Sequence, residues 1–137
     1  MGQQQLLLIV LGVIIVGIAV AVGINMMSSG AGAANQDAVM ADLQKMASDA
    51  QAWFKKPTSI GGGGRTFVAL TADAAGMGLL NAQTTNANGT YSISTAGSAT
   101  TVVFTGVGTE DQDGDGTNVT ITMTVTAAAM TPVITNR

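Results

Sequence analysis

The sequence contains no cysteine and no histidine among its 137 residues, and only two prolines. These absences exclude disulfide bridges, thiolate nucleophiles, imidazole bases and the usual zinc sites. The remaining residues contain no recognisable acid and base pair, activated nucleophile or cofactor loop. The sequence therefore predicts a protein that is not an enzyme.

Charged side chains are also few, since eight acids and five bases give a net charge of −3. The bases form no cluster along the sequence that could follow a phosphate backbone, so no contact with nucleic acid is predicted. No basic residue precedes Lys45. The N-terminal part therefore lacks both the charged start of an ordinary signal peptide and a basic flank that would set a membrane orientation.

What the sequence does have is a long apolar run near its N-terminus, LLLIVLGVIIVGIAVAVGINMM, over residues 6–27. As a helix rising 1.5 Å per residue, this run would cross a hydrocarbon core of about 30 Å. It continues directly into more helical sequence, which indicates a retained segment rather than a cleaved secretory signal. On length alone, a plain membrane anchor is the simplest interpretation.

The helical pattern changes character after a stretch of small residues at 28–33. Residues 38–54 place an apolar stripe on one face, at alternating spacings of four and three. We expect the charged residues Asp42, Lys45 and Asp49 on the opposite, solvent-facing side, and Pro57 predicts an end at Lys55 or Lys56. The stripe consists of Val39, Leu43, Met46, Ala50 and Trp53.

Together these segments predict one nearly continuous helix from Gln3 to Lys55, with any local break between Gly23 and Ala33. Its apolar half suits lipid or a bundle of identical helices, and its amphipathic half suits packing on a globular head. We therefore divide the chain into a polymerisation or transmembrane segment, 1–33, and a unit comprising the amphipathic half and a β-rich head, 34–137. Small residues four apart would let such helices approach closely; they are Gly17 with Ala21 and Ala19 with Gly23.

Residues 1–56, from Met1 through the apolar run to the amphipathic end near Trp53 and Phe54, resemble the N-terminal helix of type IV pilins and pseudopilins. The resemblance implies an α+β fold, a leader removed by a prepilin peptidase and a methylated amine on Met1. It also implies passage from the inner membrane, through its assembly machinery, into an extracellular helical homopolymer on the cell surface. Cell adhesion, surface motility or DNA uptake would be the downstream uses.

The sequence departs from that family in two ways. The acidic residue at the fifth mature position is replaced by Gln5, which can accept a hydrogen bond but carries no charge, and the helix-breaking proline is missing. If Met1 is the initiator methionine and Gly2 simply follows it, the removal of a leader by prepilin peptidase does not apply. A pseudopilin of a secretion system and a tethered binding module that never polymerises remain alternatives. The expected polymerisation residues are Met1, Gln5, Gly12, Gly17, Ala19, Ala21 and Gly23.

The rest of the chain predicts a small head of three or four antiparallel strands. Alternation around residues 91–94, a β-branched run at 101–107 and strict alternation at 119–126 indicate strands, and the apolar face of the last should cover the helix stripe. The pair Asn88 and Gly89 predicts a tight turn with positive φ. We interpret Gly61–Gly64 as a flexible connector, because no Lys-Ser/Thr pair follows it as in a phosphate loop.

One loop has the pattern of a cation site. Residues 111–116 read DQDGDG, which matches the first half of an EF-hand loop, with Asp111, Asp113 and Asp115 as alternate ligands. The carbonyl of Thr117 would be a fourth ligand, and Asn118 or Glu110 could complete the shell. The match stops there, because the twelfth position is Thr122 rather than glutamate. The pattern fits either a weak calcium site or a solvated acidic turn without an ion.

Overall fold

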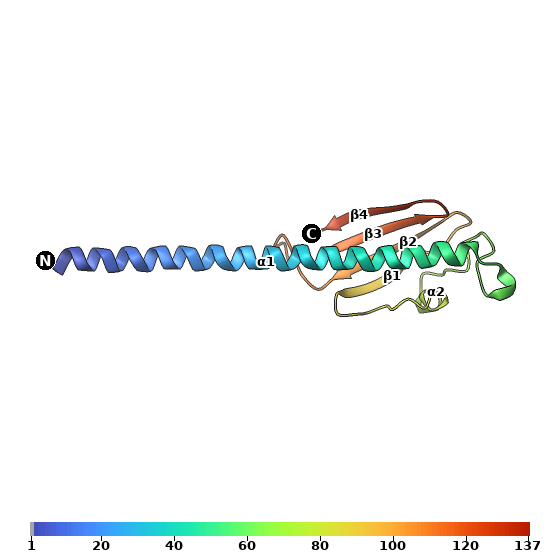
Figure 1. Cartoon of the computed structure of the whole chain (residues 1–137), viewed down its shortest axis with the longest axis horizontal. Coiled ribbons are helices and arrows are strands. Elements are labelled where there is room, and N and C mark those ends of the chain that lie inside the picture. Colours follow the sequence, from blue (N-terminus) through green and yellow to red (C-terminus); the bar gives the residue numbers. More distant parts are fainter. Residues whose placement is uncertain (1) are drawn as a thin grey trace.

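The computed structural model describes residues 2–137 and shows one long helix with a small head on its second half (Figure 1). The helix, α1, runs from Gly2 to Lys55 without interruption, about 80 Å at 1.5 Å per residue. The expected α+β class is confirmed. The head comprises a 3₁₀ turn η1 (Thr58–Ile60), a short helix α2 (Ala74–Leu79) and the strands β1 (Gly89–Thr95), β2 (Thr101–Gly108), β3 (Thr120–Thr126) and β4 (Met130–Asn136).

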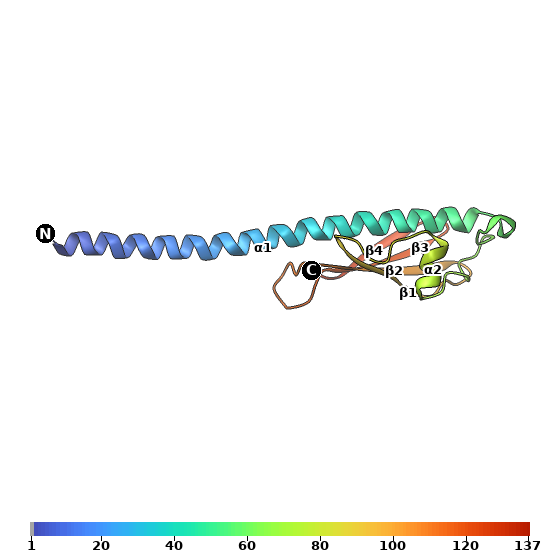
Figure 2. The ribbon, with the colours of Figure 1, turned by 90° about the horizontal axis from the view of Figure 1, so that it is seen from below.

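The four strands form one antiparallel sheet in the order β1-β2-β3-β4. Figure 2 shows this sheet as a layer along one side of the second half of α1. The three strand regions predicted from alternation are confirmed, and β4 is an additional edge strand. Its Pro132 falls opposite Met123 on that edge, where a missing amide is tolerated because no further strand needs it.

The core lies between α1 and the inner face of the sheet. All five residues of the predicted helix stripe are buried, and the apolar side chains of β3 alternate with its half-exposed threonines as expected. Phe54 and Phe67 close the far end of the core with their ring centroids 4.6 Å apart. The sheet side of the core includes Phe104, Val119, Ile121, Met123 and Val125.

The helix has no break between Gly23 and Ala33, where any break was expected. A glycine weakens a helix by only about 1 kcal/mol and keeps its amide donor, so isolated glycines do not interrupt it as a proline would. Burial begins at Gly32 and Asn35. The head therefore first contacts the helix at Gly32, just before the division expected between residues 33 and 34, and that division stays a prediction.

The glycine loop after α1 is an ordered helix cap rather than a flexible connector. The amides of Gly63, Gly64 and Arg65 donate to the carbonyls of Trp53, Lys56 and Phe54 at 2.8–2.9 Å. These carbonyls lie where the next helical turn is missing, so the loop supplies the amide donors that the end of α1 lacks. A Cβ on Gly63 would overlap the ring of Trp53, which explains the absence of a side chain there.

The turn before β1 forms, but without the positive φ expected of Asn88 and Gly89. Instead, the Oδ1 atom of Asn86 accepts from the amides of Asn88 and Gly89 at 2.9 and 3.2 Å. The side chain thus stabilises the reversal of the chain, as in an Asx turn, and no left-handed residue is needed.

Candidate functional site

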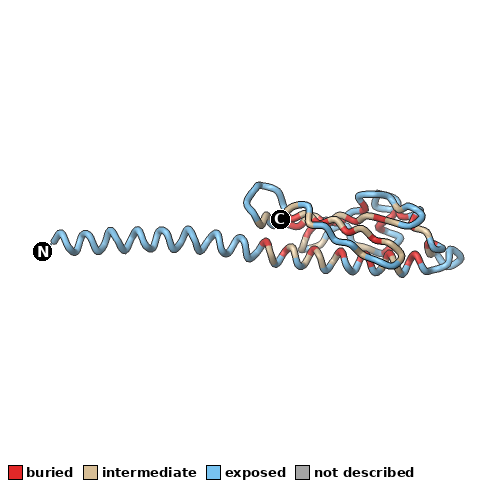
Figure 3. Tube along the Cα trace, turned by 90° about the horizontal axis from the view of Figure 1, so that it is seen from above, coloured by how far each residue is buried: buried red, intermediate tan, exposed pale blue. Residues whose placement is uncertain are grey.

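The apolar half of α1 extends beyond the head, and its described residues are exposed along its whole length (Figure 3). It is long and apolar enough to cross a membrane, and none of its most apolar window is buried. Of the expected polymerisation residues, Met1 lies outside the described residues. The others all lie on this exposed segment: Gln5, Gly12, Gly17, Ala19, Ala21 and Gly23.

The glycines of this segment have no neighbour within their own chain. A Cβ built on Gly12, Gly17 or Gly23 meets nothing within 4 Å. The stripe containing Gly17 and Ala21 and the stripe containing Ala19 and Gly23 are roughly 160° apart around the helix, at about 100° per residue. The segment therefore offers two separate small-residue surfaces to other molecules.

Leaving such a surface in water would be costly. Its large side chains, such as Leu7 and Ile24, are 69% and 64% exposed. Burying one of them contributes about 1.5–3 kcal/mol. The full set therefore exceeds the ~5–15 kcal/mol by which a domain is stable. The segment requires lipid or protein around it.

The structure brings together the three predicted aspartates of the loop between β2 and β3. One carboxylate oxygen each of Asp111, Asp113 and Asp115 lie within 4.8 Å of one another. Asp111 accepts from the amides of Gly114 and Gly116, both at 2.7 Å, and these glycines have φ of 78° and 89°, which side chains rarely adopt. The Gly116 and Gly114 amides hold the pKa of Asp111 below its ordinary value.

These residues fit a hard cation in part. Calcium takes six to eight oxygen ligands, and the three carboxylates would supply the charge and some of the oxygens. Asp115 also accepts from the Thr117 amide at 2.7 Å, which keeps Thr117 beside the cluster, whereas the Asn118 side chain donates to the Gly108 carbonyl instead. Calcium binding, with water completing the shell, stays a prediction.

Asn35 holds this loop against α1, a role that the sequence pattern did not reveal. Its Oδ1 accepts from the amides of Thr109 and Glu110 at 3.0 and 3.4 Å, and its Nδ2 donates to the Asn88 carbonyl at 2.8 Å. Asn35 precedes Val39 by four residues and so continues the buried stripe, which is the signal that could have identified it. The acidic loop therefore lies at the end of the head nearest the apolar segment.

Asp42 was expected on the solvent face but is half-buried against the head. Its Oδ2 accepts from Asn86, Asn88 and Tyr91 at 2.8, 2.9 and 2.6 Å. Burial alone would raise the pKa of Asp42, but these three hydrogen bonds and the charge of Lys45 hold it below its ordinary value. Burial, followed by the hydrogen bond and charge of Asp42, raises the pKa of Tyr91. The other two charged residues of that face, Lys45 and Asp49, form an ion pair with an N to O distance of 3.8 Å.

Three basic residues gather at the opposite end of the head, although they form no cluster along the sequence. Lys55 ends α1, Lys56 follows it, and the capping loop brings the backbone of Arg65 back to Phe54, with an N to O distance of 2.8 Å. All three side chains are exposed. The capping loop thus adds Arg65 to the end of the head that carries Lys55 and Lys56, and the prediction of no nucleic-acid contact stays a prediction.

Compared with protein-family models, curated proteins and solved structures, the chain matches none of them.

Proposed function

We propose that this chain is the structural subunit of an extracellular filament of the type IV pilus kind, assembled through packing of its apolar helices. It is inserted in the inner membrane first and then transferred, by the assembly machinery and after prepilin peptidase cleavage, into a helical homopolymer. The observation that carries the proposal is the continuous α1, whose first half is apolar and uncovered while its second half carries the head.

The placement of the head supports this function. The sheet covers only one side of α1, and the other side of the same helix segment stays exposed (Figure 2). That exposed side is formed mostly by small or uncharged residues, which would let the helix approach other helices closely. They include Ala34, Ala41, Gln44, Ser48 and Ala52.

The unbroken helix does not suit a tethered binding module. Because α1 is unbroken across the junction, the head has no flexible linker that would let it reach a ligand away from the membrane. A rigid helix with a side-mounted head instead suits a polymer in which helices form the core and heads form the surface. The function is structural rather than catalytic, and Gln5 would accept a hydrogen bond from the amine of a neighbouring subunit in that core.

Negative-stain electron microscopy of material sheared from cells expressing the chain tests the proposal directly. We expect long, thin filaments that contain the chain by mass spectrometry. Membrane-bound subunits without fibres would contradict the filament and favour a pseudopilin or a tethered module.

A single substitution tests the packing. Gly17→Leu adds bulk that meets nothing within the chain, so the head should fold normally while filament yield falls at least about tenfold. Val22→Phe is the matched control, because it adds as many heavy atoms as Gly17→Leu does, at an exposed position away from both small-residue stripes. Normal filaments from the Gly17 variant would remove these stripes from the assembly contact.

A further inference from the structure

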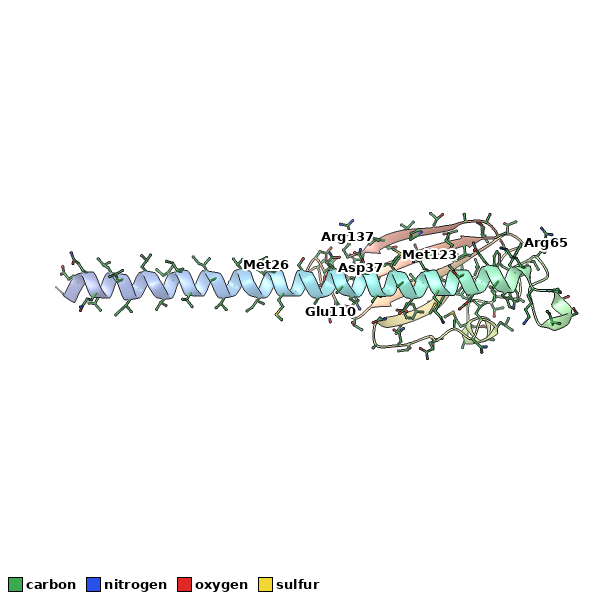
Figure 4. All side chains as sticks on the ribbon, viewed as in Figure 1. Met26, Asp37, Arg65, Glu110, Met123 and Arg137 are labelled. Carbon is green, nitrogen blue, oxygen red and sulfur yellow. The ribbon has the colours of Figure 1, made fainter. Side chains whose placement is uncertain are left out.

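The two ends of the head carry opposite charge. We call the exposed cations Lys55, Lys56 and Arg65 the basic tip, and the acids at the end nearest the apolar segment the acidic base. Figure 4 shows Arg65 at the end of the head far from the apolar segment, and Asp37, Glu110 and Arg137 at the end of the head nearest to it. The acidic base comprises Asp37, Glu110, Asp111, Asp113 and Asp115.

The charges at the two ends are unequal in number and opposite in sign. The tip carries three positive charges, and the base carries five negative charges that the single nearby cation Arg137 reduces to four. Asp73, the carboxylate on the loop before α2, accepts from Thr71 and from the Gly76 amide. Among residues 2–137 no ion pair joins Asp73 to a cation of the tip.

The two ends cannot neutralise each other within one chain. From Asn35, at the base, to Lys55, at the tip, the helix rises about 30 Å at 1.5 Å per residue. Opposite charges farther apart than about 8 Å are screened at physiological ionic strength. Among residues 2–137 the ion pair present is Lys45 with Asp49, halfway along the head. Both charged ends are therefore available to another molecule.

The position of the tip argues against a membrane as its partner. The apolar segment that would enter a bilayer ends near Met27, and the tip begins at Lys55, about 40 Å farther along the same rigid helix. The lipid surface holding the helix is thus out of reach of the cations. A second copy, shifted along the helix direction by about the length of one head, brings a base to the tip.

We propose that the basic tip of one copy docks on the acidic base of the next copy along the filament. The inference rests on the proposed function and specifies its head contact. Because tip and base are different surfaces, the contact is heterologous and repeats without closing, which is the geometry of a fibre. The neighbour's cations also relieve the repulsion among three carboxylates that lie within 4.8 Å of one another.

Charge reversal tests this contact in full-length chains expressed in cells. The tip variant carries Lys55→Glu, Lys56→Glu and Arg65→Glu, and the base variant carries Asp37→Lys, Glu110→Lys and Asp113→Lys. The base variant spares Asp111 and Asp115, whose carboxylates accept the loop's amides at 2.7 Å. Fluorescence of Trp53, the single tryptophan, verifies that each head is folded.

Each variant alone should lower filament yield at least about tenfold. In each variant the tip of one copy and the base of the next copy carry charge of the same sign and repel each other. Co-expression of the two variants, or all six changes in one chain, should restore the yield to within about threefold of wild type. Folded variants that assemble like wild type would overturn the contact. This conclusion would hold even if removing calcium with a chelator dissolved the filaments. Loss in the tip variant alone, without rescue by the base variant, would also overturn it.

Failure of this contact is distinguishable from failure of the proposed function. If wild-type chains form no filament, the function itself is contradicted. If wild-type filaments form and both reversed variants assemble normally, the helices assemble the polymer and only the tip-to-base contact is wrong.

Discussion

The two halves of α1 belong to one helix but obey different constraints. Leu11, in the first half, is 53% exposed and contacts no head residue, whereas Leu43, in the second half, is fully buried. The first half must therefore be stabilised by other molecules and the second by its own chain. The comparison teaches that removing a large apolar side chain from this helix affects assembly in the first half and folding in the second.

The glycines show the same division. A Cβ on Gly12 or Gly17 would meet nothing, while a Cβ on Gly32 would lie 2.6 Å from the Cα of Gln112. In the first half a glycine thus preserves access for a neighbouring molecule. At Gly32, where the head begins, it lets the acidic loop approach α1.

The largest expected effect compares the same substitution in both halves. Leu43→Ala should lower the free energy of unfolding by roughly 2–5 kcal/mol, because it leaves a cavity in the core. Leu11→Ala should leave it unchanged. Urea unfolding in detergent, followed by Trp53 fluorescence, measures both. Similar losses for the two variants would contradict the division of α1.

A second comparison uses glycines. A Cβ on Gly108 would overlap the Oδ1 of Asn35, which accepts from the amide of Thr109 at 3.0 Å. Gly108→Ala should therefore lower the free energy of unfolding by about 1–3 kcal/mol. Gly12→Ala should cause no loss in the same assay. A Gly108 variant as stable as wild type would mean that Asn35 does not fix the loop.

The pH dependence of stability gives a smaller effect. Because the folded pKa of Asp42 is held below its ordinary value of 3.8, its contribution is present above that value and is lost as pH falls through the folded pKa. The difference in Tm between wild type and Asp42→Asn should therefore shrink from about pH 6 to about pH 2.5. Asp37→Asn, on the exposed side of the same helix, is the control. A difference independent of pH would mean that the charge of Asp42 adds nothing.

Calcium should have the smallest effect. If the loop binds it, calcium at about five times its dissociation constant should raise the free energy of unfolding by about 1 kcal/mol. A thermal melt of the full chain in detergent, with and without millimolar calcium, measures this. The double variant Asp113→Asn and Asp115→Asn should abolish the shift, and an unchanged wild-type melt would count against the site.

The sequence predicted the helix, its end near Lys55 and three of the four strands, because each depends on a regular local pattern. It did not predict β4, where Pro132 and irregular polarity obscure the alternation. It also predicted that the three aspartates of the acidic loop lie close together, since they are near neighbours in the chain. It assigned Asp42 wrongly, because helical spacing places Asp42 with Lys45 and Asp49 and says nothing of Asn86, Asn88 or Tyr91.

The sequence by itself determined that one long helix would have an apolar half and an amphipathic half, since periodicity is a local property of the chain. Only the tertiary structure decided which charges lie together. Arg65 lies at the tip because the glycine loop returns to cap α1, where the Arg65 amide donates to the Phe54 carbonyl. The acidic loop is held at the base by Asn35, more than seventy positions earlier. Such contacts arise from packing between distant segments, which no local pattern encodes.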